Sequence, residues 1–349
     1  MAKPIIIALD GMGGDDAPDV IVEGASIAAT KLPDVNFLLF GQEEVLEPLL
    51  KPYPNLEGRL RLIHTDDVIK SEDKPSQAMR RGRKSSMGLA IQAVKGGDAD
   101  VAVSAGNTGA LMALSKIMLR MLPGIDRPAL SSLVPTVKDD CIMLDLGANV
   151  ECSAENLVQF AIMGAAKARV VLGLDNPRVG LVNIGTEELK GHDTIRMADQ
   201  ILKVSSIPMD YMGFVESDGL GKGNVDVFVF DGFTGNVAIK AIEGVAKMIG
   251  TLLKESFSSS MLSKGGYLLA KSGLNHLKNH MDPNNHNGAI LLGLNGLVVK
   301  SHGSTTAEGF YAAIKVANDT AQQDLCNLIS QDLENFGDEH SKDLEEEPK

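Results

Sequence analysis

The amino-acid sequence predicts an α/β fold in which a mainly parallel sheet carries helices on both faces. Short apolar runs alternate with longer segments of helical periodicity along most of the 349 residues, as in repeated strand–helix units. Many of the 36 glycines come just after the apolar runs, where tight loops are needed. No Pro- or Ser-rich linker and no internal repeat divides the chain. We therefore expect a single two-lobed α/β domain over residues 1–337.

Each expected strand is a short apolar run, which suits burial between two layers of helices. These runs cover residues 5–9, 35–40, 60–64, 100–104, 142–146, 179–184 and 225–230. Residues 288–299 are expected to form a hairpin, because Asn295-Gly296 is a favoured hairpin turn.

Helical periodicity fills the segments between the strands. It predicts helices over residues 18–31, 75–94, 108–122, 154–172, 194–204 and 305–335. Pro18 suits the first turn of a helix, and Pro123-Gly124 suits a helix end. Residues 254–281 are expected to form a protruding amphipathic helical hairpin, broken at Gly265-Gly266. Residues 338–349 carry six acidic residues and two lysines, so a disordered acidic tail is expected there.

Composition and motif searches exclude several classes of protein. A net charge of −13 argues against general nucleic-acid binding, which needs a basic surface. The three cysteines form no CxxC pair, so we expect no disulfide framework or structural zinc, and a cytoplasmic location. The first residues lack the length of a signal peptide, and no run of 18 apolar residues is present. Searches for a P-loop, a dinucleotide fingerprint, a G-x-S-x-G elbow and a zinc-binding H-E-x-x-H motif all fail.

Glycine and small polar residues follow six of the expected strands directly. In open parallel sheets, ligands bind beyond the carboxyl ends of the strands. Free N–H groups at helix starts attract anions there. We expect the six loops to share one edge of the sheet and to bind a phosphate-like anion, although a single such loop can equally be an ordinary turn. The candidate binding residues are Asp10, Gly13, Gly14, Ser104, Gly106, Asn107, Thr108, Asn183, Gly185, Thr186, Asp231, Thr234, Gly235 and His302. A lone loop histidine such as His302 is more often a simple hydrogen-bonding residue.

A basic stretch stands out in this acidic chain. Its members are Arg80, Arg81, Arg83 and Lys84. They form either a solvated helix face or a docking surface for an acidic partner or a phosphate, which arginine binds through two hydrogen bonds.

Five motifs resemble the bacterial phosphate acyltransferases of phospholipid synthesis (the PlsX family). They are Ala8–Pro18, Lys74-Pro75-Ser76 with Ser85-Ser86-Met87, Ser104–Ala110, Asn183–Gly191 and Asp231–Asn236. The resemblance covers about residues 4 to 335. Gly11, Asp16 and His192 depart from commoner choices in the family.

The resemblance implies a reaction in which inorganic phosphate attacks the thioester of a long-chain acyl group on acyl carrier protein. It implies a fold like that of phosphotransacetylases and isocitrate/isopropylmalate dehydrogenases, a homodimer, and no metal or organic cofactor. It favours Lys190 and Asn236 as catalytic residues, since a lysine and an amide can stabilise the oxyanion formed at the thioester carbon. Without the resemblance, Lys190 reads as an exposed loop lysine and Asn236 as a helix cap.

Basic residues flank a narrow apolar stripe in the expected hairpin. Lys264, Lys271 and Lys278 recur every seven residues, beside a stripe that includes Tyr267, Leu274 and Leu277. This pattern suits either the surface of an anionic membrane or packing in a dimer. The resemblance favours reversible attachment to the inner face of the membrane, where a glycerol-3-phosphate acyltransferase would take up the product. The alternatives are a short-chain phosphotransacetylase that uses coenzyme A and a non-catalytic membrane scaffold of the same fold.

Overall fold

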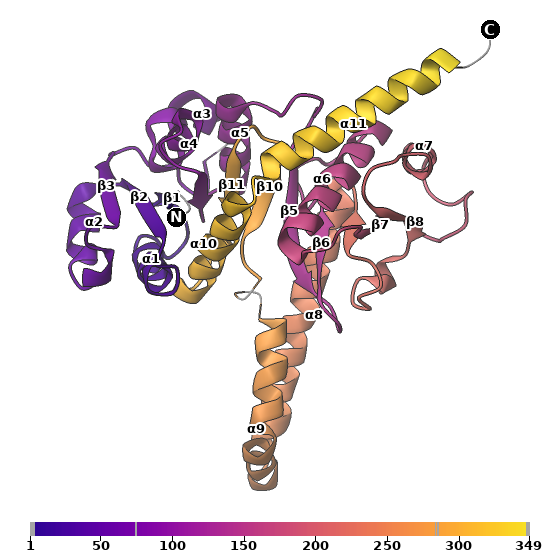
Figure 1. The fold of residues 1–349 in the computed structure, drawn as a ribbon. Helices are drawn as coiled ribbons and strands as arrows, with labels where there is room; N and C mark the ends of the chain where they lie inside the picture. Colours follow the sequence, from indigo (N-terminus) through magenta and orange to yellow (C-terminus); the bar gives the residue numbers. More distant parts are fainter. Residues whose placement is uncertain (1–3, 74, 283, 285, 347–349) are drawn as a thin grey trace.

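The computed structural model describes residues 4–73, 75–282, 284 and 286–346. Within them, 11 strands form one sheet in the order β3-β2-β1-β4-β11-β10-β5-β6-β9-β7-β8 (Figure 1). The strands of the first half are β1 (Ile5–Asp10), β2 (Val35–Gly41), β3 (Leu60–His64), β4 (Val101–Ser104) and β11 (Leu297–Lys300). The central strands are β10 (Ala289–Leu292) and β5 (Ala129–Pro135). The second half has β6 (Asp140–Leu144), β7 (Arg178–Val182), β8 (Asp210–Val215) and β9 (Val227–Val229).

Neighbouring strands within each half are parallel, which confirms the mainly parallel sheet. Strand β10 is antiparallel to both β11 and β5, and β5 is antiparallel to β6. Three antiparallel pairings in a row leave the strands of the second half pointing opposite to those of the first. The carboxyl ends of the two halves therefore lie at opposite edges of the sheet.

Helices cover both faces, as the sequence predicts. The α-helices of the described residues are α1 (Asp19–Lys31), α2 (Glu43–Leu50), α3 (Pro75–Arg81), α4 (Ser86–Gly96), α5 (Thr108–Leu119), α6 (Ala154–Leu172), α7 (Asp193–Lys203), α8 (Gly232–Ser258), α9 (Met261–Met281), α10 (Ala307–Gln322) and α11 (Leu325–Glu346). Three-residue 3₁₀ turns cover Pro54–Leu56, Gly82–Lys84 and Ser217–Gly219. Along β1, Ile7 and Leu9 pack in one core cluster with α1 and α10, whereas Ala8 packs in another with α4 and α5. This alternation is what a strand buried on both faces requires.

Helices α8 and α9 form a hairpin that projects away from the sheet (Figure 1). Its turn lies at Ser259-Ser260, not at Gly265-Gly266, which lie inside α9. The predicted break was wrong because Ser260 caps α9, its hydroxyl accepting a hydrogen bond from the Ser263 N–H at 3.0 Å. A glycine inside a helix costs only about 1 kcal/mol. No helix in the described residues is both long and apolar enough to cross a bilayer.

The structure differs from the sequence prediction in further places. Strands β5 and β8 and helix α2 were not predicted. The helix expected over residues 75–94 is split into α3 and α4 by a 3₁₀ turn. The helix expected over residues 305–335 is two helices, with Asp324 between them at a φ of 47°. Where a disordered tail was expected from residue 338, α11 continues to Glu346, since residues 338–346 include three glutamates, a lysine and a leucine, which favour helix, and lack proline. Residues 347–349 lie outside the described part.

One lysine is buried deep in the second half of the molecule. Lys167, on α6, is only 1% exposed. Its ammonium group donates hydrogen bonds to the Ser131 carbonyl oxygen at 3.1 Å and to the Ser131 hydroxyl at 3.0 Å. Burial lowers the pKa of Lys167 to about 7, because a charge is disfavoured in an apolar interior.

Candidate active site

The loops that follow β1, β4 and β11 come together at one edge of the sheet. We call these loops, residues 10–16, 104–108 and 301–304, the first loop cluster. The Ser104 hydroxyl donates to the buried Asp10 carboxylate at 2.7 Å and accepts from the Gly106 N–H at 3.1 Å. A Cβ at Gly13 would lie 2.3 Å from Asp10 Oδ2, so only glycine permits this approach. Gly14 lies beside Ala105 and Gly303, which connects all three loops.

Two opposite charges are buried under the first loop cluster. Lys300, at the end of β11, is 9% exposed, and its ammonium group donates to the carbonyl oxygens of Ala105, at 3.2 Å, and of Ser301. Burial lowers the pKa of Lys300 to about 8, while the nearby Asp10 opposes that shift. Burial raises the pKa of Asp10, and its hydrogen bonds with Ser104 and Ser86 reduce the effect. Lys300 therefore contributes a cation directly beneath the loops.

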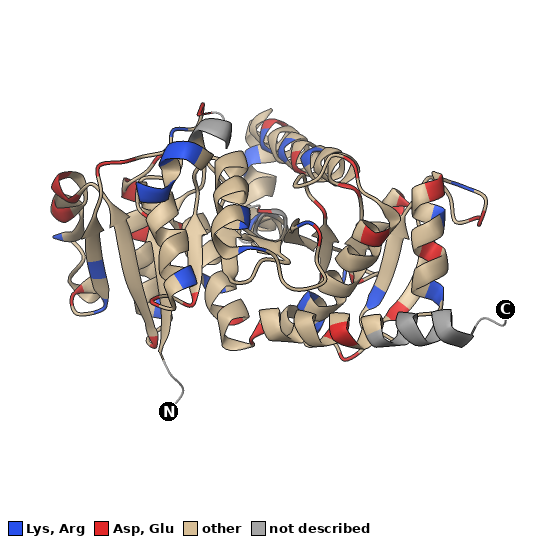
Figure 2. Cartoon of the chain, turned by 90° about the horizontal axis from the view of Figure 1, so that it is seen from above, with Lys and Arg blue, Asp and Glu red and all other residues tan. Residues whose placement is uncertain are grey.

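The N-terminus of α5 belongs to the first loop cluster. Asn107 caps the helix by accepting from the Ala110 N–H at 3.0 Å, and Thr108 is the first helical residue. The Asn107 amide also donates to the carbonyl oxygens of Ser71 at 2.7 Å and Asp73 at 3.1 Å. The segment just before α3 is thereby tied to the cluster. The basic residues Arg80, Arg81, Arg83 and Lys84 follow in α3 and the turn after it, and all four are exposed. Figure 2 shows blue ribbon on this helix.

The loops that follow β6 and β9 form a second loop cluster, residues 145–149 and 231–236, at the opposite edge. Asp231 caps α8, accepting from the Thr234 N–H at 2.8 Å and from its hydroxyl at 2.7 Å. Gly235 permits the closest approach, because a Cβ there would lie 1.9 Å from the Asp145 carbonyl oxygen. Asn236 follows in the first turn of α8, and its side chain is exposed. Asn236 therefore is not the cap of α8, since Asp231 has that role.

The loop after β7 is folded on itself. The Asn183 amide donates to the Lys190 carbonyl oxygen at 3.1 Å, and the Lys190 N–H donates to the Glu187 carbonyl oxygen at 3.0 Å. Gly185 lies next to the aliphatic part of the Lys190 side chain, while Thr186 and Lys190 are exposed. The loop thus presents the Lys190 ammonium group to solvent.

The expectation that all six loops share one edge was wrong. The loops after β1, β4 and β11 lie at one edge, and those after β6, β7 and β9 lie at the other, because β10 and β5 reverse the strand direction. Helix α8 connects the two edges. It starts at the second loop cluster, and three of its charged residues, Lys240, Glu243 and Lys247, influence His302 in the first. Burial lowers the pKa of His302, and Lys240 adds to that effect.

Several polar residues of the two clusters were not predicted as site residues. They are Lys300, Asp145, Asn149 and Asn287, all less than one-tenth exposed. The Asn287 amide donates to the Ser301 hydroxyl at 2.8 Å and the Thr305 hydroxyl at 2.9 Å, which holds the loop after β11. The available signal for Lys300 was a charged residue at the end of an apolar strand, just before a Ser-His-Gly loop.

Comparison with known proteins decides the family. A family model described as "Fatty acid synthesis protein" matches residues 5–328. The chain belongs to this family. It is 52% identical over 317 residues to the phosphate acyltransferase of Paramagnetospirillum magneticum, covering 91% of this chain and 90% of the relative. It is 53% identical over 333 residues to the phosphate acyltransferase of Rhodospirillum centenum, covering 95% and 94%. Membership of the fatty acid synthesis protein family at this level of identity makes the chain an acyltransferase.

Solved structures confirm the fold class. A phosphotransacetylase from Streptococcus pyogenes superposes with a TM-score of 0.62 at 18% identity, covering 92% of this chain and 95% of that one. The EutD phosphotransacetylase from Staphylococcus aureus gives 0.59 at 17% identity, covering 91% and 94%. At this identity the likeness shows that members of the fatty acid synthesis protein family share a fold with phosphotransacetylases.

Proposed function

We propose that this acyltransferase moves a long-chain acyl group from acyl carrier protein to inorganic phosphate, giving acyl phosphate for phosphatidic acid synthesis. The first loop cluster carries this proposal. It combines glycines at close backbone approaches, the N-terminus of α5 and the buried Lys300 ammonium group. Such an arrangement suits a phosphate anion. Relatives named phosphate acyltransferase support the same acceptor.

The proposed reaction needs no covalent intermediate on the protein. A phosphate oxygen forms a bond to the thioester carbon, and the carbon–sulfur bond breaks. The thiolate takes up a proton and leaves as free carrier-protein thiol. After the phosphate oxygen has bonded to the carbon and before the carbon–sulfur bond breaks, the carbonyl oxygen carries negative charge, which hydrogen-bond donors must stabilise. Lys190 and Asn236 are the proposed donors, because both side chains are exposed at post-strand loops or helix starts. They lie on loops of the second half of the sheet, while the phosphate loops lie on the first. Helix α8 runs between the two sets of loops, and its Lys240 acts electrostatically on both Lys300, beneath the first loop cluster, and His302 within it.

The direct test measures release of free thiol from purified long-chain acyl carrier protein, with and without phosphate. Release that depends on phosphate and yields acyl phosphate is the expected result. Acetyl coenzyme A serves as the matched alternative donor. Faster turnover with that donor would identify a short-chain phosphotransacetylase. A protein that releases no thiol from either donor would fit the scaffold alternative instead.

The exposed basic residues of α3 and the following turn are the proposed docking surface for acyl carrier protein. Changing Arg80, Arg81 and Arg83 together to glutamine is expected to raise KM for acyl carrier protein, with a smaller effect at high salt. The physical reason is that a basic surface speeds encounter with an acidic partner and salt screens this attraction. Steady-state kinetics at two ionic strengths provide the measurement. If KM and its salt dependence stay unchanged, the stretch is only a solvated face.

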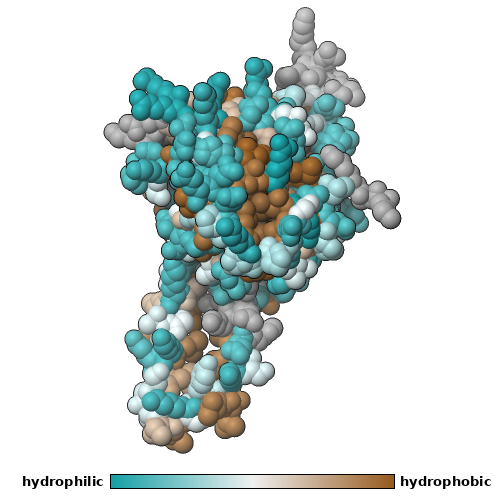
Figure 3. Space-filling view, turned by 90° about the vertical axis from the view of Figure 1, so that its left-hand side faces the viewer, coloured by the Kyte–Doolittle hydropathy of each residue, from teal (hydrophilic) through white to brown (hydrophobic). Residues whose placement is uncertain are grey.

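The hairpin end is the proposed contact with the membrane, which would make the cytoplasmic enzyme reversibly peripheral. Its most exposed apolar residues are Met261 (84%), Leu262 (88%), Leu268 (71%) and Leu269 (92%). Figure 3 shows brown atoms at this end of the molecule. The predicted stripe is less available for contact with a membrane. The ring of Tyr267 packs edge-on against that of Phe257 of α8, with 5.7 Å between the ring centroids, and only 40% of Leu277 is exposed. Leu274 is only partly exposed, and the side chain of Lys278 lies outside the described part.

Charge supports the same surface. Lys254, Lys264 and Lys271 are exposed around the hairpin. Each lysine near an anionic bilayer is worth about 1 kcal/mol. Changing Leu262 and Leu269 together to glutamate is expected to abolish co-sedimentation with anionic vesicles, because buried apolar area is replaced by repelled charge. Val204→Glu, at an exposed apolar residue of the body, is the control and should still sediment. Undiminished sedimentation of the double variant would rule out the hairpin end as the anchor.

A second copy of the chain is the proposed partner for the outer face of α8. Phe233, Val237, Val245, Met248 and Leu252 recur at helical spacing and are each about half exposed or more. Apolar area of this extent along one helix suits a homodimer contact. Sedimentation equilibrium of the Leu262/Leu269 double variant and of Val204→Glu distinguishes this dimer contact from the membrane contact. Both variants should remain dimers.

A further inference from the structure

The carboxylate of Asp145 organises the loop after β6. Asp145 is fully buried, and the groups that donate hydrogen bonds to its carboxylate are N–H groups of neutral amides. Oδ1 accepts from the backbone N–H groups of Leu130 at 3.0 Å, Gly147 at 3.2 Å and Ala148 at 2.9 Å. Oδ2 accepts from the Asn149 backbone N–H at 2.7 Å and from its side-chain amide at 2.9 Å. The loop from 145 to 149 is therefore wound around a single carboxylate.

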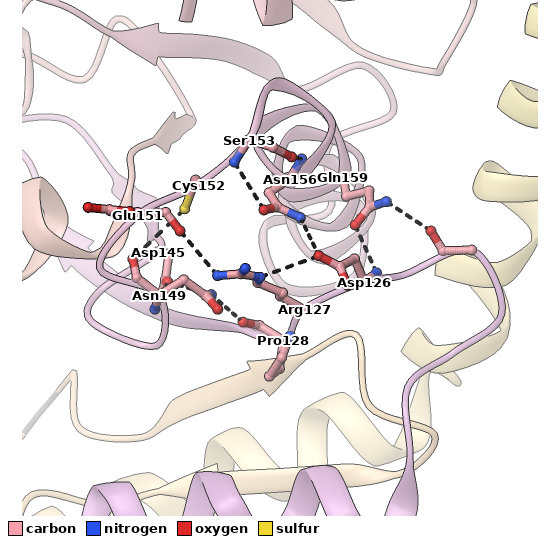
Figure 4. Close-up of polar contacts among 11 residues, drawn as sticks. Asp126, Arg127, Pro128, Asp145, Asn149, Glu151, Cys152, Ser153, Asn156 and Gln159 are labelled. Carbon is pink, nitrogen blue, oxygen red and sulfur yellow. Dashed lines mark hydrogen bonds and ion pairs between the residues drawn. The ribbon is translucent and has the colours of Figure 1, made fainter. Parts of the chain in front are cut away.

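A second set of contacts fixes this loop from outside, as Figure 4 shows. The Asn149 amide also donates to the Pro128 carbonyl oxygen at 2.7 Å. Arg127 donates to the Glu151 carbonyl oxygen at 3.2 Å and pairs with Asp126 at 3.3 Å. Asp126 in turn accepts from the Asn156 amide at 3.1 Å, near the start of α6. The segment before β5 and the start of α6 thus hold the loop in place.

The first turn of α8 rests directly on the same loop. The Gly232 N–H donates to the Asn149 carbonyl oxygen at 2.8 Å. Gly235 lies against the Asp145 carbonyl oxygen. A Cβ at Gly147 would lie 3.6 Å from the Asn236 Cβ and 3.8 Å from its Oδ1. The Asn236 side chain therefore lies beside the loop that Asp145 organises, and the helix turn that carries it is held against that loop.

We propose that Asp145 is a positioning residue for Asn236, acting through the 145–149 loop and the first turn of α8. The inference rests on the proposed function, in which Asn236 contacts the reacting carbonyl group. A carboxylate is needed at this position because N–H groups donate to both of its oxygens, so each of the two atoms must be an acceptor. An asparagine in its place turns an NH₂ group toward N–H donors, so one side of the loop must move.

The experiment compares Asp145→Asn, Asn236→Ala and the double variant in steady-state kinetics. Asp145→Asn is expected to lower kcat by about 100-fold, the loss typical of a reacting group displaced by about 1 Å. KM for phosphate should change less than about 2-fold, since the printed hydrogen bonds of the Asp145 carboxylate go to its own loop and to Leu130 and not to the first loop cluster. In the double variant, Asn236→Ala should cost almost no further rate, because two residues that act through one another are not additive.

Asp226→Asn is the matched control for lost stability. Asp226 also lies in the second half of the sheet, and its carboxylate binds Arg178 at 2.6 Å, away from the second loop cluster. This variant should lose thermal stability but keep kcat. A purely structural role for Asp145 would make Asp145→Asn behave in the same way.

The outcomes separate the inference from the proposed function. A wild-type rate for Asn236→Ala overturns the proposed role of Asn236, and the inference falls with it. If Asn236→Ala is slow but Asp145→Asn, like Asp226→Asn, loses thermal stability and keeps kcat, the inference alone is overturned. A double variant whose loss is the product of the two single losses also overturns the inference alone. If Asp145→Asn does not fold, Asn149→Ala removes two of the loop hydrogen bonds and decides by the same kinetic comparison.

Discussion

Replacing either Lys190 or Asn236 by alanine is expected to lower kcat about 100- to 1000-fold, the usual loss when one oxyanion donor is removed. Both side chains are exposed, so neither replacement empties the core, and the thermal melting temperature should stay close to that of the wild type. Initial rates at saturating phosphate, together with a thermal melt, provide the measurement.

Lys222→Ala is the control for the loss of an exposed lysine in the same half. Lys222 pairs with Asp218 at 2.6 Å on the surface, and its removal should leave kcat unchanged. Rates near the wild type for both Lys190→Ala and Asn236→Ala would contradict the proposed oxyanion site. A slow Lys190→Ala with an active Asn236→Ala would assign the stabilisation to the lysine alone.

Replacing the buried Lys167 by methionine is expected to stabilise the protein at pH 6 and to destabilise it near pH 10. The pKa of Lys167 falls from 10.5 to about 7 on folding. The unfolded chain therefore binds the Lys167 proton more tightly than the folded protein does. Burial of the charged lysine lowers the free energy of unfolding by its full amount below about pH 7, and this loss of stability vanishes above about pH 10.5. A shift of this size is worth about 4 to 5 kcal/mol. Methionine leaves the Ser131 hydroxyl and carbonyl without their donor, which costs about 1 to 3 kcal/mol at every pH.

The measurement is the free energy of unfolding of wild type and Lys167→Met across this pH range. The net gain should be about 2 kcal/mol at pH 6, since the charge cost exceeds the lost hydrogen bonds there. Lys315→Met, at an exposed lysine that pairs with Asp319, should show no such trend. A difference between Lys167→Met and wild type that does not vary with pH would contradict the burial argument.

The sequence predicted the layers of the fold better than the direction of its strands. Strongly apolar runs such as 35–40 were found as strands because their pattern is local. Strand β5 was missed, since Ser131 and Ser132 interrupt its apolar pattern. That one omission concealed the reversal between the two halves, and with it the separation of the loops onto two edges.

The prediction of the site likewise succeeded for local features and failed for features that depend on tertiary contacts. Glycine and small polar residues after strands identified both loop clusters, because the residues that shape such a loop are consecutive in the sequence. The contacts that organise those loops join distant residues, as when Lys300 reaches Ala105 from 195 positions away. Asp145 and Leu130 likewise meet only because β5 and β6 pair. Such contacts depend on tertiary structure, so a single sequence contains no direct signal for them.

Helix α8 is one continuous rod that runs from Asn236 to the turn before α9, which carries the proposed membrane contact. From Asn236 to Ser258 the helix rises about 33 Å, while only about one turn precedes Asn236. The rod is clamped at its near end, where Gly232 and Gly235 lie against the 145–149 loop. Asn236 and the hairpin turn lie on the same side of this clamp, at about 2 to 6 Å and about 35 to 39 Å along the helix, so the helix works as a lever that moves both in the same direction. Any tilt of the hairpin on a lipid surface therefore moves the amide by at most about a sixth as much as the tip.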